Sequence, residues 1–195
     1  MEKKKILRID TGGTIAAELG ENGLKPELTC GQLLRYIPDI DRICQVECEQ
    51  LFSLDSTNIQ PKHWVRIAQA IQRRYREFDG FVIAHGTDTM AYTAAGLSYL
   101  IQGSPKPIVL TGAQKPIGFE TTDSKQNLRE AFAVVASGMA GVVLVFNRKI
   151  ILGTRARKTR SKSFEAFSSI NYPLLRLVQD GRVIRYIRPE AWALP

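Results

Sequence analysis

The sequence is poor in the residues from which metal sites, disulfide frameworks and serine–histidine centres are built. Its 195 residues include three cysteines and two histidines. Cys30, Cys44 and Cys48 are odd in number and lack Cys-x-x-Cys spacing, so we predict reduced thiols with only a packing role. His63 and His85 have no carboxylate at ligand spacing, and no Gly-x-Ser-x-Gly turn occurs. We therefore expect no metal, and we interpret His85 as a half-buried side chain that donates to a backbone carbonyl.

Long apolar runs are also missing. No segment approaches the roughly 20 apolar residues needed to cross a bilayer. The lysines at positions 3–5 are not followed by the apolar segment and small-residue cleavage site of a secretory signal. With 44% hydrophobic and 24% charged residues, the composition is that of an ordinary globular protein. We expect a cytoplasmic protein without a membrane partner.

Acidic residues are outnumbered by basic ones. The chain has 27 Lys and Arg against 19 Asp and Glu, a formal net charge of +8, which raises nucleic acid as a partner. The cations are densest at residues 73–76 and 155–162. Neither run carries the signature of an RNA-binding surface with interleaved aromatic residues, and most such runs are solvated faces. Nucleic acid is therefore not expected as a partner.

Strand-like and helix-like segments alternate along the chain. Short apolar runs are typical of strands covered on both faces, whereas period-2 alternation indicates a half-buried strand. The predicted strands are 6–9, 44–52, 80–84, 107–110 and 141–146, with 150–152 paired to the last and 182–186 at an edge. The predicted helices are 31–37, 61–75, 89–101 and 123–136, and residues 18–29 are predicted to form an exposed loop. This order indicates an α/β fold with a mostly parallel sheet.

Four turns rich in hydroxyl groups or glycine follow these strands. They are residues 11–14, 53–57, 85–88 and 111–113. In open α/β sheets, ligands bind at the carboxyl ends of the strands, where the strand order switches. The four turns should therefore gather at one rim and form an active site.

The side chains in these turns suggest nucleophilic chemistry by a hydroxyl group. Thr14 and Thr87 each lie on a strand-end turn, with Asp88 beside the second. A threonine hydroxyl needs a nearby base to act as a nucleophile. Lys158 lies among arginines, which favour its neutral form, and a neutral lysine can act as that base. Polar turn residues without a catalytic role would explain the same set at least as well.

Two longer motifs change this balance. Thr11-Gly12-Gly13-Thr14-Ile15-Ala16 and His85-Gly86-Thr87-Asp88-Thr89-Met90 resemble the two signature segments of the bacterial-type L-asparaginase family, of the type I form. Asp55-Ser56-Thr57 is similar to the family's substrate-binding loop, and Thr111-Gly112-Ala113-Gln114 to the turn beside it. The segment with Lys158 is similar to the one that bears the catalytic lysine. The resemblance runs from about residue 4 to 173 and beyond.

The resemblance implies catalytic roles for four residues. Thr14 would attack the side-chain amide of L-asparagine and form an acyl-enzyme, which water would hydrolyse to L-aspartate, with ammonia as the other product. Thr87, Lys158 and Asp88 would form a hydroxyl–amine–carboxylate relay for proton transfer. The resemblance implies neither a cofactor nor a metal.

The resemblance also implies how the substrate is held. Asp88 would bind the α-ammonium group, Ser56 the α-carboxylate, and Thr57 would add a contact to the same end of the substrate. Backbone groups near Thr87 and Ala113 would face the amide oxygen. A small zwitterion needs such anchors, and the tetrahedral intermediate needs preorganised donors.

The domain organisation follows from the same resemblance. Residues 1–185 would form a flavodoxin-like, three-layer amino-terminal domain, and residues 186–195 would begin the linker to a carboxyl-terminal domain. In the family that domain supplies an acidic residue to a neighbouring subunit, which implies a homo-oligomer, dimer or tetramer. One departure is Leu24, which stands where the family usually has a tyrosine.

Two other readings stay open. The first is the amidase subunit of an archaeal-type tRNA-dependent amidotransferase, which shares both motifs but normally carries an extra domain ahead of the first strand. The second is a non-catalytic fragment of the same fold that binds an amino acid or another subunit, which Leu24 favours.

Overall fold

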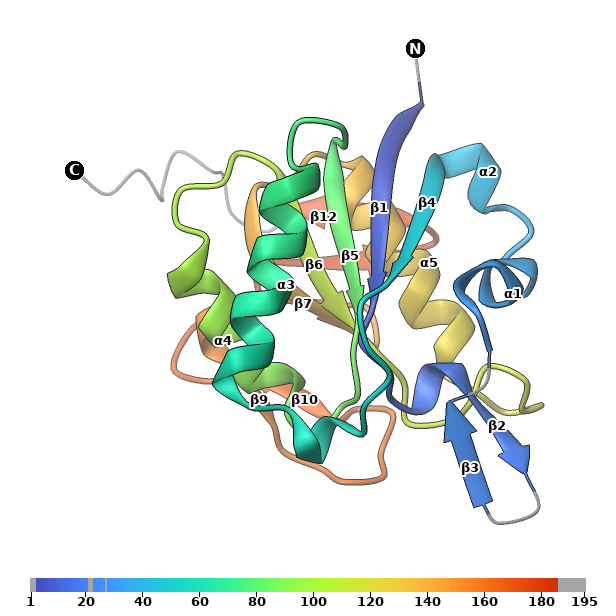
Figure 1. The fold of residues 1–195 in the computed structure, drawn as a ribbon. Coiled ribbons are helices and arrows are strands. Elements are labelled where there is room, and N and C mark those ends of the chain that lie inside the picture. Colours follow the sequence, from blue (N-terminus) through green and yellow to red (C-terminus); the bar gives the residue numbers. More distant parts are fainter. Residues whose placement is uncertain (1–2, 21–22, 27, 186–195) are drawn as a thin grey trace.

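The protein is built in three layers around one large sheet (Figure 1). The computed structural model describes residues 3–20, 23–26 and 28–185. Helices α3 (Pro61–Arg74) and α4 (Met90–Leu100) cover one face of the sheet. Helices α1 (Cys30–Arg35), α2 (Ile40–Ile43) and α5 (Ser124–Ala136) cover the other. The α/β class and the layered arrangement predicted from the sequence are thus confirmed. Among the described residues, no helix has the length and apolar character to cross a membrane.

The sheet has eight strands, and its centre is parallel. In spatial order they are β12 (Arg182–Arg185), β11 (Arg176–Gln179), β8 (Lys149–Leu152), β7 (Gly141–Phe146), β6 (Pro107–Thr111), β5 (Gly80–Ala84), β1 (Lys4–Asp10) and β4 (Cys44–Gln50). The strands from β7 to β4 are parallel, whereas β8, β11 and β12 run antiparallel to their neighbours. From β1 the chain first adds β4 on one side and then β5 on the other. The strand order therefore switches at β1, and the turns after β1, β4 and β5 meet there.

Two small hairpins flank the sheet. Strands β9 (Ala156–Lys158) and β10 (Phe167–Ser169) form one of them. The other, β2 (Ala17–Gly20) with β3 (Gly23–Pro26), lies where we predicted an exposed loop. The prediction of a loop was wrong because two strands of four residues each, with one large apolar residue apiece, leave little trace in hydrophobic periodicity. Leu24 pairs with Leu19 in this hairpin. Residues 186–195, which we assigned to the start of a linker, lie outside the described residues.

The sheet separates two hydrophobic cores, and β1 contributes to both. Ile6 faces the core under α5, while Leu7 and Ile9 face the core under α3 and α4. Helix α3 packs on the sheet through apolar residues, and Ile67 and Ile71 are buried at its centre. Helix α5 begins and ends where the sequence indicated, with Asp123 as its N-cap residue and Gly138 after its last turn.

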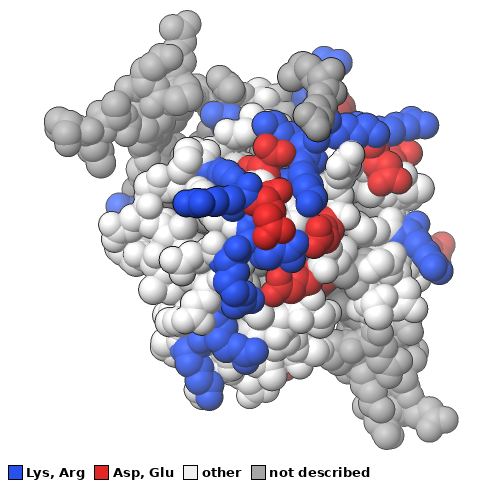
Figure 2. All heavy atoms as spheres, turned by 45° about the horizontal axis from the view of Figure 1, so that its top comes forward, with Lys and Arg blue, Asp and Glu red and all other residues white. Residues whose placement is uncertain are grey.

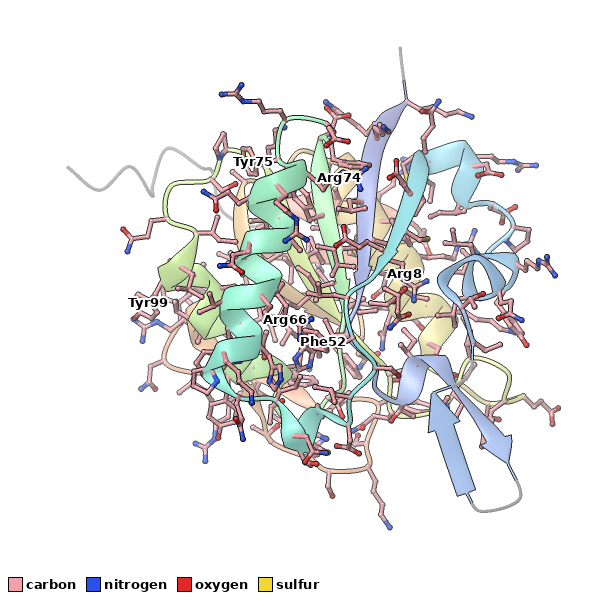
Figure 3. All side chains as sticks on the ribbon, in the orientation of Figure 1. Arg8, Phe52, Arg66, Arg74, Tyr75 and Tyr99 are labelled. Atoms are coloured by element: carbon pink, nitrogen blue, oxygen red, sulfur yellow. The ribbon has the colours of Figure 1, made fainter. Side chains whose placement is uncertain are left out.

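A charged pair is buried on the α5 side of the sheet. Arg8 is fully buried and donates to Asp10 Oδ1 at 2.7 Å (Figure 3). Burial raises the pKa of Asp10, although the Arg8 charge and hydrogen bond act in the opposite direction. Asp10 also ends β1, directly before the first glycine turn. Removing one partner would leave an uncompensated buried charge, which is strongly destabilising.

The cysteines differ in state. Cys44 is a free, buried thiol, and its burial raises its pKa to about 12, so it is inert at neutral pH. Cys48 is disulfide-bonded, and the prediction that all the cysteines are reduced was therefore wrong. Spacing along the chain could not show this, because a disulfide depends on which segments the fold brings within bonding distance.

Two of the three arginines in the basic run at residues 73–76 pair with carboxylates. Arg73 contacts Glu49 at 3.3 Å, and Arg74 contacts Glu47 at 2.5 Å and Glu77 at 2.9 Å. Figure 2 shows that blue and red side chains are intermixed on this face of the molecule. The hydrogen bond from Arg74 lowers the pKa of Glu47. The run is therefore a solvated face of mixed charge, as predicted.

Candidate active site

The turns that follow β1, β4 and β5 enclose one small cavity at the rim of the sheet. Its volume is about 270 Å³. It is lined by Gly13, Thr14, Ala17, Leu54, Asp55, Ser56, Gly86, Thr87 and Asp88. Drug-sized ligands occupy pockets of about 300–1,000 Å³, so this cavity suits a smaller ligand. Four of the predicted site residues, Thr14, Ser56, Thr87 and Asp88, are thus brought together.

Glycines let these turns approach one another. Gly13 has φ +88°, a conformation that other residues rarely adopt, and a Cβ atom there would lie 2.5 Å from Gly86 Cα. A Cβ atom on Gly86 would in turn lie 2.6 Å from Ser56 Cβ. Side chains at either glycine would push the turns apart. The close packing of the turns therefore explains the glycines of the two motifs.

The first turn is anchored by its neighbours but leaves Thr14 free. Thr11 Oγ1 donates to Ala84 O at 2.9 Å, and Leu54 N donates to Thr11 O at 3.1 Å. Thr14 begins a short 3₁₀ helix (Thr14–Ala16) and is half-buried at the cavity wall. Within the described part of the chain, the Thr14 hydroxyl makes no hydrogen bond, so it is available to a ligand.

The loop after β4 directs Ser56 into the cavity and Thr57 away from it. Thr57 N and Oγ1 donate to Asp55 Oδ1 at 2.8 and 2.7 Å, and these bonds lower the pKa of Asp55. Ser56 is buried, and its Oγ accepts a hydrogen bond from Asp88 N at 3.3 Å. Thr89 Oγ1 donates to Ser56 O at 2.7 Å. Thr57 is exposed and is not among the residues that line the cavity.

Aromatic contacts hold the segment that leads to Ser56. The rings of Phe52 and His63 lie 5.3 Å apart, and the Arg66 guanidinium lies 5.4 Å from the Phe52 ring centre (Figure 3). His63 Nδ1 accepts from Gln60 N at 2.9 Å at the start of α3. Burial, followed by nearby cations, lowers the pKa of His63. This histidine is therefore a structural residue of the helix start.

Lys158 joins the second motif through two short contacts. Its Nζ lies 2.8 Å from Thr87 Oγ1 and 2.6 Å from Asp88 Oδ1. The Lys158 side chain is 15% exposed, whereas its neighbour Arg157 and the later Lys162 are exposed. The alternation of β9 explains the exposure of Arg157, because successive side chains of a strand point to opposite sides, whereas Lys162 lies beyond the end of that strand. Lys158 thus contacts both of the residues with which it was predicted to act, Thr87 and Asp88.

His85 is closed off from this relay. It is fully buried, with Nδ1 2.7 Å from Gly86 O and Nε2 2.9 Å from Thr93 Oγ1. Burial lowers the pKa of His85 to about 4, against the effect of its bond to Gly86. The ring is neutral, and because a carbonyl can only accept, Nδ1 carries the hydrogen. The predicted donation to a backbone carbonyl is confirmed, although the side chain is fully rather than half buried.

The turn after β6 contributes a residue whose role the sequence did not indicate. Gln114 Oε1 accepts a hydrogen bond from Thr87 Oγ1 at 3.2 Å. In the sequence, Gln114 was named only as part of a turn similar to one in the family. A polar side chain at the end of a strand was the signal that could have marked it as a site residue. Ala113 is buried and does not line the cavity.

Asp123 and Thr89 stand directly before helices α5 and α4, but neither side chain caps its helix. Asp123 accepts hydrogen bonds from Gln114 N at 2.9 Å and Lys115 N at 3.1 Å, and it makes no side-chain cap of α5. Thr89 likewise makes no side-chain cap of α4. In both cases a partner from another element occupies the capping group.

A larger hollow borders the same relay from outside. Its volume is about 740 Å³, and Asp88 and Lys158 lie at its edge. Three exposed arginines of the basic run line it, namely Arg155, Arg157 and Arg160. Thr14, Ser56 and Thr87 line the smaller cavity instead, which is therefore the candidate active site. Over the described ranges, no three His, Cys, Asp or Glu side chains gather as metal ligands.

Comparison with known proteins places this site in a family. Residues 5–191 match the family model described as "Asparaginase, N-terminal". The L-asparaginase of Thermococcus kodakarensis is 41% identical over 188 residues, which are 95% of this chain and 57% of that protein, and its structure aligns with a TM-score of 0.89. The structure of a probable cytoplasmic L-asparaginase from Campylobacter jejuni aligns with a TM-score of 0.86 at 35% identity, over 95% of this chain and 57% of that one.

Another relative carries a different name. A glutamyl-tRNA(Gln) amidotransferase subunit of Metallosphaera sedula is 37% identical over an aligned length of 198 residues, and the match covers 95% of this chain and 45% of that protein. The chain thus spans about half the length of the curated relatives it matches. The family model covers nearly all of the chain, and its two motifs form walls of the cavity. The chain therefore belongs to the asparaginase family, through the amino-terminal domain of that family.

Proposed function

We propose that this chain hydrolyses the side-chain amide of L-asparagine to L-aspartate and ammonia, through an acyl-enzyme on Thr14. One observation carries the proposal: Lys158 Nζ lies 2.8 Å from Thr87 Oγ1 and 2.6 Å from Asp88 Oδ1, at the wall of the cavity that Thr14 also lines. A positioned amine between a hydroxyl and a carboxylate is an arrangement for moving protons.

The reaction proceeds in two halves. Thr14 Oγ1 attacks the amide carbon, its proton passes to the amide nitrogen, and the C–N bond breaks to release ammonia and leave an ester on Thr14. Water then attacks the ester carbon and gives up its proton to Thr14 as the C–O bond breaks, which frees aspartate. Thr87 and Lys158 accept and return the proton during these steps, and Asp88 stabilises the ammonium form of Lys158. The assignment of Thr14 as the nucleophile rests on the family resemblance, supported by its unpaired hydroxyl in the cavity.

The polar ends of the substrate find complementary groups. Asp88 is 57% exposed in its side chain, so its carboxylate can pair with an α-ammonium group while it holds Lys158. Ser56 lines the same cavity, and its hydroxyl can donate to an α-carboxylate. Charge-assisted bonds of this kind fix both orientation and affinity.

The test is ammonia release from asparagine, combined with mass spectrometry of the protein after rapid quenching. The proposal expects ammonia from asparagine and a mass increase of one aspartyl group on the peptide that contains Thr14. An acyl group on the peptide that contains Thr87 would instead make Thr87 the nucleophile. No ammonia, with calorimetric binding of aspartate retained, would favour the non-catalytic amino-acid binder.

The second candidate is the amidase of a tRNA-dependent amidotransferase. The identity to an amidotransferase subunit over nearly the whole chain favours it. Its activity would require tRNA or the other subunit of that enzyme, so ammonia release that needs neither would exclude it. We also propose that the active form is a homo-oligomer, which sedimentation at several concentrations would test.

A further inference from the structure

We propose that Gln114 is a positioning residue that sets the direction of the Thr87 hydroxyl. This inference rests on the proposed function, because it assigns Gln114 to the relay of that reaction. Gln114 is half-buried beside the cavity but does not line it, so it would act on the substrate only through Thr87.

The carboxamide of Gln114 has one orientation. Its Nε2 donates to Ser161 O at 3.0 Å and to Ser163 O at 3.1 Å. Both partners are carbonyl oxygens, which only accept, so the two hydrogens of the amide group are used there. Oε1 is left to face Thr87 as an acceptor. Rotating the amide by half a turn would break three hydrogen bonds and place oxygen against oxygen at the two serine carbonyls.

The backbone of Gln114 is held as firmly as its side chain. Its N–H donates to both oxygens of Asp123, at 3.1 and 2.9 Å, and Asp123 is buried. Asp123 is held in turn by Asn127 Nδ2 at 3.2 Å. Gln114 therefore connects a fixed turn to the segment 161–163, which follows Lys158 in the chain.

The consequence for Thr87 follows from counting its hydrogen bonds. A hydroxyl has one hydrogen and two acceptor positions. Gln114 Oε1 takes the hydrogen, and Lys158 Nζ donates to one acceptor position. The remaining acceptor position is free on a residue that lines the cavity. Thr87 thus presents a lone pair, and not its hydrogen, to the cavity, where it can accept a hydrogen bond from a donor.

The experiment compares four variants of the chain with the unmodified protein. Gln114→Met keeps the length of the side chain and removes both its acceptor and its donors. Thr87→Val removes the hydroxyl, and the double variant Gln114→Met/Thr87→Val combines the changes. Gln102→Met is the matched control, because Gln102 is exposed and its Nε2 donates only to a carbonyl of its own turn, Tyr99 O.

The kinetic result expected is a loss in turnover without a loss in binding. Gln114→Met should lower kcat by about 10- to 100-fold with KM and aspartate affinity within about twofold, since misplacing a catalytic group lowers the rate while the substrate anchors stay. The double variant should be no slower than Thr87→Val alone, because Gln114 acts through Thr87. The proposal would be overturned if the losses in kcat of the two single variants multiplied in the double variant. It would also be overturned if Gln114→Met had the same kcat as Gln102→Met.

A second measurement does not require turnover. In urea unfolding, Gln114→Met and Thr87→Val should be coupled by more than about twofold in the equilibrium constant, as expected for groups in one hydrogen-bond network. If the two substitutions are coupled in stability but the protein releases no ammonia, the Gln114–Thr87 contact is supported and the proposed function is refuted. Additive effects on stability would refute the contact itself, whatever the activity.

Discussion

His85 should make the stability of this protein fall in mild acid. Its pKa is about 4 in the folded protein, against an ordinary value of 6.5, because the ring is fully buried. Between these two values the unfolded chain binds a proton that the folded chain does not. The stabilisation is therefore complete above about pH 6.5 and is lost as the pH falls toward 4.

The size of the effect follows from the shift. A difference of about 2.5 pKa units at 1.36 kcal/mol each lowers the free energy of unfolding by an amount on the order of 3 kcal/mol. Most of this decrease has occurred by about pH 4.5. This is a large part of the roughly 5–15 kcal/mol by which ordinary domains are stable. Asp10 and Glu130 act in the opposite direction, because burial raises their pKa values. The effect of His85 must therefore be isolated by difference.

The assay is urea unfolding, followed by tryptophan fluorescence, at a series of pH values for the unmodified chain and for His85→Asn. The asparagine amide can still donate to Gly86 O but takes up no proton. The variant should be less stable near pH 7.5, because Thr93 loses its acceptor. The difference in free energy of unfolding between the two proteins should then shrink by about 2–3 kcal/mol as the pH falls to 4.5. Parallel stability curves over this range would show that His85 is not held neutral by burial, and the reasoning would fail.

Three further predictions concern turnover and binding. Thr14→Ala should remove nearly all ammonia release while aspartate affinity, measured by calorimetry, stays largely intact; more than about a tenth of the original rate would exclude Thr14 as the nucleophile. Asp88→Asn should weaken aspartate binding as well as the rate, because the charge opposite the α-ammonium group is lost, and unchanged affinity would exclude that role. Lys158→Met should lower kcat by about 10²- to 10⁴-fold, whereas Lys162→Met should change it little; equal, small losses would make the whole basic run a solvated face.

The relay shows what local pattern can and cannot predict. The strand-end turns with Thr14 and Thr87 were predicted from short apolar runs followed by glycine and hydroxyl residues. The pattern of charge could not tell Lys158 from Lys162, since both lie in one basic run, and only the family resemblance singled out Lys158. In the structure, Lys158 lies on β9 and contacts Thr87, whereas Lys162 lies beyond the end of that strand and is exposed.

Two other residues show the same limit. Thr57 follows Ser56 directly, yet it does not line the cavity, and its hydroxyl donates to Asp55. Gln114 lies far from Lys158 in the chain, yet its side chain reaches the segment that follows Lys158. Adjacent residues can point apart, and distant ones can meet, because side-chain direction depends on the backbone at each position and contact depends on the packing of elements.

Properties that depend on neighbours along the chain could be predicted without a structure. These are the order of strands and helices, the apolar face of α3, the glycine turn after the first strand, and the two motifs that mark the family. Each is set by hydrophobic periodicity or by backbone sterics, which act over a few residues. The disulfide at Cys48, the β2–β3 hairpin, the inward turn of Lys158 and the place of Gln114 beside Thr87 became visible only in the folded chain. Each of these depends on which distant segments the fold brings side by side, and that arrangement is a property of the whole chain.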